Sequence, residues 1–132
     1  MTGDHQDRIL HTVLVVDDAE GCVATLDLAL QTLPYVVVRS ARSAEDALEV
    51  LENHAVSALV TDIHLPRMDG LELISRIRRQ PRWRSLPIVV VSADPDPSAP
   101  GNALGLGADA YFIKPFSPGA VRKKLEELMH AS

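Results

Sequence analysis

Several polar residues follow short apolar runs, at points where a β-strand would end. Asp17 and Asp18 follow one such run, and Asp62 follows another. Ser92 and Lys114 follow two more. Ligands of parallel α/β sheets bind at the carboxyl ends of the strands. If these strands are neighbours, we expect the carboxylates, the hydroxyl and the ammonium group to converge.

This set of side chains could carry out phosphoryl chemistry. Three carboxylates in one pocket would repel one another and raise each other's pKa. A Mg²⁺ ion would resolve this, since it takes oxygen ligands and typically uses one or two carboxylates together with phosphate oxygens. Lys114 would add a second positive charge and Ser92 a hydroxyl donor, which makes a cradle for a phosphoryl group. A carboxylate beside the ion could act as the nucleophile and form an aspartyl phosphate.

The elements that must position these side chains can be read from the hydrophobic pattern. Continuous apolar runs are typical of strands buried on both faces. We expect strands over 12–16, 35–38, 58–61, 88–91 and 110–113.

Helical spacing of apolar residues predicts the segments between the strands. We expect helices over 20–33, from Ser43 onward, and over 71–79, 99–106 and 118–130. Pro34 should stop the first of these, and Gly107 should cap the fourth. Strands that alternate with helices indicate a parallel sheet covered on both faces, with right-handed crossovers. The 132 residues suit one domain, 1–132, in which residues 1–11 form a polar N-terminal arm.

Composition and charge narrow the classes of partner. The chain is 46% hydrophobic, and its formal net charge of -5 argues against direct nucleic-acid binding. A group of arginines around Trp83 could instead form a nucleic-acid-binding surface. Most of them, however, lie near the C-terminus of a predicted helix, where cations complement the helix dipole. The group comprises Arg76, Arg78, Arg79, Arg82 and Arg84.

Compartment and redox state follow from what the sequence lacks. A single cysteine, Cys22, excludes an internal disulfide and a multi-thiolate metal site. No apolar run approaches the about 18 residues of a membrane span, and the first residues show no secretion signal. We therefore expect a cytoplasmic protein with no membrane partner.

Four segments, in this order, resemble the receiver domain of two-component response regulators, of the chemotaxis-regulator type. They are VVDD at 15–18, DIHLPRMDG at 62–70, VSA at 91–93 and GADAYFIKPF at 107–116. The resemblance covers about residues 13–128. It implies a flavodoxin-like α/β fold, a doubly wound five-stranded parallel sheet in the order 2-1-3-4-5, with a short fourth helix.

The resemblance also implies an activity. Asp62 would accept a phosphoryl group from a histidine kinase or a phosphotransfer protein, in a Mg²⁺-dependent reaction that switches binding of an output protein. Asp18 would bind the ion directly and Asp17 largely through water, with Asp62 and the backbone carbonyl of His64 as further ligands. The domain would catalyse only its own phosphorylation and dephosphorylation, and so would not be an enzyme in the usual sense.

Further roles are implied for the residues around the phosphoryl group. Ser92 and Lys114 would bind its oxygens, and Tyr111 would move inward as Ser92 shifts. The family pattern implies a cis bond between Lys114 and Pro115. His64 and Asp94 would flank the water that hydrolyses the aspartyl phosphate, so we expect their side chains to tune its lifetime.

Other functions remain open. A receiver-like interaction module that works without phosphorylation is the main alternative, although the intact acidic, hydroxyl and lysine positions favour the phosphoacceptor. An aspartyl-nucleophile phosphatase is a weaker alternative, because its Asp-x-Asp pattern is not matched at Asp17. The Pro- and Gly-rich segment 95–107 has weak helix propensity, and we expect it to be mobile until activation or partner binding orders it.

Overall fold

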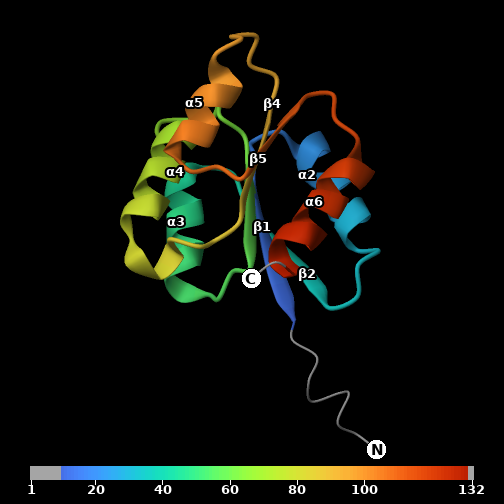
Figure 1. Ribbon diagram of the computed structural model, residues 1–132. Coiled ribbons are helices and arrows are strands. Elements are labelled where there is room, and N and C mark those ends of the chain that lie inside the picture. Colours follow the sequence, from blue (N-terminus) through green and yellow to red (C-terminus); the bar gives the residue numbers. More distant parts are fainter. Residues whose placement is uncertain (1–9, 131–132) are drawn as a thin grey trace, which may run out of the picture.

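The computed structural model describes residues 10–130, and its centre is a single parallel sheet (Figure 1). The strands are β1 (His11–Val16), β2 (Val36–Ala41), β3 (Ala58–Thr61), β4 (Ile88–Ser92) and β5 (Ala110–Ile113). Their order in the sheet is β2-β1-β3-β4-β5, which confirms the predicted doubly wound fold. The chain reverses its winding direction between β1 and β3, so the expected ligand-binding crevice lies at the carboxyl ends of these strands.

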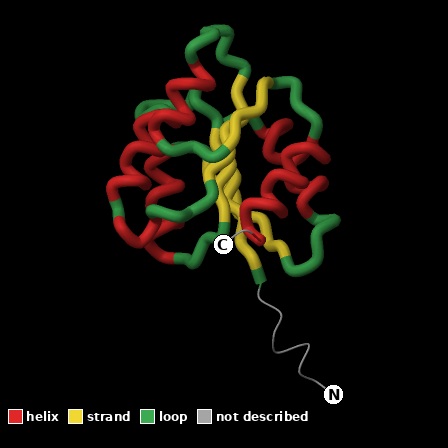
Figure 2. Tube along the Cα trace, viewed as in Figure 1, coloured by secondary structure: helices red, strands yellow, loops and turns green. Residues whose placement is uncertain are grey.

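Helices cover both faces of the sheet. They are α2 (Glu20–Leu30), α3 (Ala44–Asn53), α4 (Gly70–Arg79), α5 (Ala99–Leu106) and α6 (Pro118–His130), with a short 3₁₀ turn, η1 (Pro81–Trp83). Figure 2 shows the strands as a central layer, with α3, α4 and α5 on one side and α2 and α6 on the other. Residues 10–130 include no helix that is both long and apolar enough to cross a lipid bilayer.

The two helical layers enclose two separate hydrophobic clusters. Along β1, Leu14 and Val16 point into the cluster under α3, α4 and α5, whereas Val13 and Val15 point into the cluster under α2 and α6. All four side chains are fully buried. This alternation explains why the strand reads as one continuous apolar run, since both of its faces are covered.

The structure corrects the limits of the first strand, the first helix and the second strand. The first strand begins at His11, which was expected in the polar arm, and residues 1–9 of that arm lie outside the described residues. The first helix ends at Leu30, not at residue 33, because the next backbone bonds tighten to the residue three positions back: the N–H of Thr32 donates to Ala29 and that of Leu33 to Leu30. The second strand begins at Val36 and continues to Ala41. Tyr35 lies outside the strand because its φ of 66° is left-handed.

The predicted span of the fourth intervening helix, 99–106, is confirmed as α5. Gly107 ends it in the left-handed conformation, with a φ of 119°, and its N–H bonds to the carbonyl groups of Ala103 and Leu104. This is the capping role predicted for the glycine.

Candidate functional site

The sheet topology brings the predicted site residues to one edge. Strand β3 pairs with β1 through Thr61 and Val16, so Asp62 and Asp17 leave the sheet side by side. On the other side, Ser92 pairs with Ile113, which places Lys114 next to the end of β4. The predicted convergence is therefore found for Asp17, Asp62 and Lys114, with Ser92 at the neighbouring strand end.

Lys114 joins the two buried carboxylates. Its Nζ donates to Oδ2 of Asp17 and to Oδ2 of Asp62, at 2.9 Å in both cases. The side chains of Asp17 and Asp62 are only 1% and 10% exposed. Two carboxylate oxygens thus already share one cation at a nearly dry position.

Burial and pairing act in opposite directions on Lys114. Burial of the ammonium alone would lower its pKa, but the hydrogen bonds and charges of Asp17 and Asp62 outweigh burial and raise the pKa above the usual value for lysine. Lys114 therefore stays charged at neutral pH and can offset the negative charge of a phosphoryl group.

The loop after β3 fixes the Asp62 carboxylate from the other side. Its Oδ1 accepts the backbone N–H of His64 at 3.1 Å. The same loop passes very close to the start of α4, where a Cβ on Gly70 would lie 2.1 Å from the Asp62 carbonyl oxygen. Gly70 instead lets its N–H donate to the Ile63 carbonyl at 2.7 Å. The sequence motif included Gly70, but its steric role emerges only from the structure.

Asp18 is not drawn into this network. Oδ1 of Asp17 accepts the N–H of Ala19 at 2.9 Å, which closes a tight turn and leaves Asp18 exposed. Within residues 10–130, no group of three or more Asp, Glu, His or Cys side chains is gathered tightly enough to hold a metal ion alone. The two carboxylates held by Lys114 are nevertheless hard oxygen donors in a buried corner. Mg²⁺ usually takes one or two carboxylates and completes its shell with water, so the residues present fit the ion.

Ser92 and the loop after β4 form the far side of the site. Ser92 is fully buried, its Oγ accepts the N–H of Asp94 at 3.2 Å, and its carbonyl accepts the N–H of Lys114. The bond between Lys114 and Pro115 is cis, as the resemblance implied.

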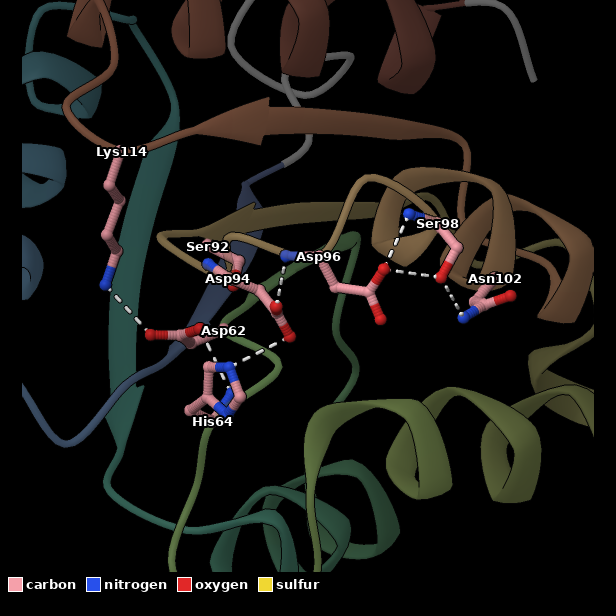
Figure 3. Close-up of polar contacts among 8 residues, drawn as sticks. All are labelled: Asp62, His64, Ser92, Asp94, Asp96, Ser98, Asn102 and Lys114. Atoms are coloured by element: carbon pink, nitrogen blue, oxygen red, sulfur yellow. Dashed lines mark hydrogen bonds and ion pairs between the residues drawn. The ribbon is translucent and has the colours of Figure 1, made fainter.

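A contact that the sequence did not reveal spans the site. Nε2 of His64 lies 3.0 Å from Oδ2 of Asp94, so the loops after β3 and β4 meet beside Asp62 (Figure 3). The two residues are far apart in the sequence, and their contact depends on how the two loops fold over the sheet edge.

Cys22, on α2, is a half-buried neighbour of Asp17 to which the sequence analysis gave no role in the site. Burial, followed by a hydrogen bond to Asp17, raises the pKa of its thiol to about 12, so it is protonated at neutral pH.

Tyr111 packs against the hydrophobic cluster under α3, α4 and α5. Its hydroxyl is buried and has no hydrogen-bond partner among the described residues. The tyrosine therefore lies inward on the α5 side of the sheet, where its ring gains apolar contacts and its hydroxyl stays unpaired.

The arginine group is engaged within the fold. Arg78 donates to the carbonyl groups of Gly107 and Trp83. Arg76 and Arg79 pair with the Glu72 carboxylate. Arg82 pairs with Glu52 and stacks over the Trp83 ring, 4.3 Å from its centroid. Four of the five arginines in this group thus make contacts within the protein.

Comparisons with known proteins agree with this geometry. A family model described as the response regulator receiver domain matches residues 13–126. Over 118 residues, the chain is 31% identical to a chemotaxis protein CheY homolog from Campylobacter jejuni. The alignment covers 89% of this chain and 91% of that protein. Over 120 residues, it is 34% identical to the alkaline phosphatase synthesis transcriptional regulatory protein PhoP of Bacillus subtilis, with 91% of this chain and 49% of that protein covered.

A solved structure gives the same result. The signal receiver domain of an HD domain-containing protein from Pseudomonas fluorescens Pf-5 superposes with a TM-score of 0.83 at 29% identity, covering 92% of this chain and 88% of that one. The sheet order, the paired carboxylates at its switch point and the match over residues 13–126 lead to one conclusion. The chain belongs to the response regulator receiver domain family of two-component signalling systems.

Proposed function

We propose that this receiver domain accepts a phosphoryl group on Asp62 from a phosphohistidine of a histidine kinase or phosphotransfer protein. The observation that carries the proposal is the placement of Lys114, with its Nζ 2.9 Å from a carboxylate oxygen of both Asp17 and Asp62. A carboxylate held at a sheet edge beside a permanent cation is suited to attack phosphorus, because the cation offsets the charge that accumulates there.

The proposed transfer is a single displacement. An Oδ atom of Asp62 forms a bond to phosphorus while the bond between phosphorus and the donor imidazole nitrogen breaks. The imidazole keeps that electron pair, and Asp62 becomes an acyl phosphate. Lys114 would stay paired with the carboxylates and bind a phosphoryl oxygen, while the Ser92 hydroxyl would donate to another.

Asp17, Asp18 and Asp62, with the backbone carbonyl of His64, would hold a Mg²⁺ ion. When bound, the ion would supply positive charge for the phosphoryl oxygens. Asp17 would remain fixed by the Ala19 N–H at Oδ1, which leaves Oδ2 turned toward Lys114. Asp18, exposed at the rim, could turn toward the ion at little cost.

The phosphorylated domain would then bind an output protein differently. Ser92 and Tyr111 are the proposed switch residues, since one lies at the end of β4 and the other is in the neighbouring strand, β5. A shift of Ser92 toward the phosphoryl group would change the space around the inward tyrosine. We propose that the domain works in the cytoplasm and modifies only itself.

The lifetime of the phosphorylated state is a separate property of the same site. The contact between His64 and Asp94 lies beside Asp62, where a hydrolytic water must approach. Replacing His64 with Asn removes the Nε2 contact, so we expect dephosphorylation to become several-fold faster. The decay of the phosphorylated protein after removal of the phosphodonor measures this. An unchanged decay rate would rule out the tuning role.

The proposed phosphoacceptor can be identified chemically. The protein is incubated with acetyl phosphate and Mg²⁺, treated with borohydride, which reduces an acyl phosphate to the alcohol, and digested for peptide mass analysis. We expect homoserine at position 62 and nowhere else. Homoserine at Asp17 or Asp18 would move the acceptor, and its absence throughout would favour an interaction module that works without phosphorylation.

A further inference from the structure

A series of polar contacts, one between His64 and Asp94 and two hydrogen bonds beyond it, connects the loop after β3 with the start of α5 (Figure 3). Nε2 of His64 contacts Oδ2 of Asp94 at 3.0 Å, and Oδ1 of Asp94 accepts the N–H of Asp96 at 2.9 Å. Oδ1 of Asp96 in turn accepts the N–H of Ser98 at 2.9 Å. This series of contacts thus reaches Ser98, which immediately precedes α5.

Asp94 joins two separate structures through one rigid group. One of its carboxylate oxygens faces the loop after β3, and the other shapes the loop after β4. The Asp94 side-chain carboxylate is only 19% exposed, whereas the His64 side chain is 65% exposed. A planar carboxylate cannot turn away from His64 without displacing the oxygen that binds the Asp96 N–H. The position of His64 and the shape of the second loop are therefore linked.

The next links lie in the first turn of α5. Oδ1 of Asp96 also accepts the Ser98 hydroxyl at 2.8 Å, and these two bonds from Ser98, the backbone bond first, lower the pKa of the Asp96 carboxyl. The Asp96 carbonyl accepts the N–H of Ala99 at 3.0 Å. Asn102, one turn into the helix, donates to the Ser98 hydroxyl at 3.4 Å.

The helix that follows depends on such support. Within its eight residues, α5 contains Pro100, Gly101 and Gly105, and the Ser98 side chain does not cap its N-terminus. Glycine costs about 1 kcal/mol relative to alanine inside a helix, so the segment is a weak helix on its own. The bonds of the loop before it therefore support this end of the helix, together with the burial of Ala99 and Ala103.

We propose that His64 is a positioning residue for α5. Through its contact with Asp94, a change in the conformation of the loop after β3 would reach the first turn of that helix. The proposal rests on the proposed function only in assigning a phosphoryl group to Asp62. The coupling itself is a property of the unphosphorylated chain. It provides a side-chain route from the loop after β3 to α5. This route does not involve Tyr111, and it meets Ser92 only at Asp94, whose N–H donates to the Ser92 hydroxyl.

Hydrogen exchange of the unphosphorylated protein tests the coupling. We expect the α5 amides in His64→Ala to exchange about 3- to 10-fold faster than in the wild type, as for the loss of one polar contact. Asp94→Ala removes this contact and the bond to the Asp96 N–H, so its effect should be at least as large, and the double variant should exchange no faster than Asp94→Ala. His130→Ala removes an exposed histidine at the end of α6 and should leave α5 unchanged.

A conservative replacement separates positioning from general damage to the site. Glutamine places an amide nitrogen near the position of Nε2, so His64→Gln should restore slow exchange in α5. Exchange of the β3 amides should be the same in all variants, which shows that the fold is intact. The proposal would be overturned if the α5 amides of His64→Ala exchanged as slowly as those of the wild type. It would also be overturned if the increases in exchange rate of the two single variants added up in the double variant. Because no phosphodonor is present, neither result depends on whether Asp62 is phosphorylated.

Discussion

At the scale of single residues, Lys114 sets the electrostatics of the site. Asp17 and Asp62 are both buried, and without a cation between them their charges would repel in a poorly solvated corner. Lys114 reaches them from the end of β5 and satisfies one oxygen of each. The residue proposed to bind a phosphoryl oxygen therefore also stabilises the folded protein by itself.

Lys114→Met should lower the free energy of unfolding by about 1–3 kcal/mol at neutral pH, because it removes two charged hydrogen bonds and leaves two carboxylates unpaired. The pKa of Lys114 is raised in the folded protein, so this stabilisation is complete below the ordinary lysine value of about 10.4 and is lost as the pH rises through the folded value. Urea unfolding of both proteins across this range measures the difference.

Lys124→Met is the matched control, since Lys124 lies on α6 and, among residues 10–130, forms its ion pair with the exposed Glu127. It should change the free energy of unfolding by less than about 1 kcal/mol. A destabilisation of Lys114→Met that disappeared near about pH 8 would contradict the raised pKa.

At the scale of elements, the start of α4 is determined by one close approach. Gly70→Ala would place a Cβ 2.1 Å from the Asp62 carbonyl oxygen and 2.9 Å from the Ile63 Cα, both backbone atoms that cannot yield easily. We expect it to cost at least about 3 kcal/mol of unfolding free energy, as severe overpacking does. Gly101→Ala, where the added Cβ meets no heavy atom within 4 Å beyond its chain neighbours and the backbone of its own helix, should instead stabilise α5 by about 0.5–1 kcal/mol. Thermal unfolding of both variants tests the contrast, and equal effects would refute it.

Arg78 connects α4 with the end of α5 and with η1. Its guanidinium donates to Gly107, Trp83 and Asp109, and the side chain is 17% exposed. Burial lowers the pKa of Arg78, and the Asp109 charge opposes this effect. Arg78→Ala should therefore cost about 2–3 kcal/mol of unfolding free energy.

The neighbouring arginine provides the comparison. Arg79 is exposed and pairs with Glu72. Arg79→Ala should change the free energy of unfolding by less than about 1 kcal/mol in the same urea titration. Equal losses for Arg78 and Arg79 would show that the contacts of Arg78 with the carbonyl groups do not hold these elements together.

The elements whose limits could be predicted from the sequence are those whose ends are marked by residue types. The strand 58–61 and the helix 99–106 have the predicted limits, because apolar runs, Pro and Gly mark their ends. The predicted end of α2 and the predicted start of β2 were wrong, because these limits depend on a tightened last turn and on the left-handed conformation of Tyr35. Such local backbone choices leave little trace in residue types.

At the scale of the whole molecule, the site is a product of topology. Lys114 and Asp17 are 97 positions apart in the sequence, yet the strand order places them within hydrogen-bonding distance. Residue types at strand ends were sufficient to predict this convergence, because parallel strands bring their carboxyl ends to one edge. The contact between His64 and Asp94 could not be predicted in this way, since it depends on the conformations of two loops.

The measurement that tests the central claim most directly is the intact mass of the protein after incubation with acetyl phosphate. The wild type and Asp27→Asn, which makes the same chemical change on the exposed surface of α2, should each gain the mass of one phosphoryl group when Mg²⁺ is present. Asp62→Asn should gain none, and chelation of Mg²⁺ should abolish the gain in the wild type and in Asp27→Asn. A full gain in Asp62→Asn, or no gain in the folded wild type, would contradict the assignment of Asp62 as the phosphoacceptor.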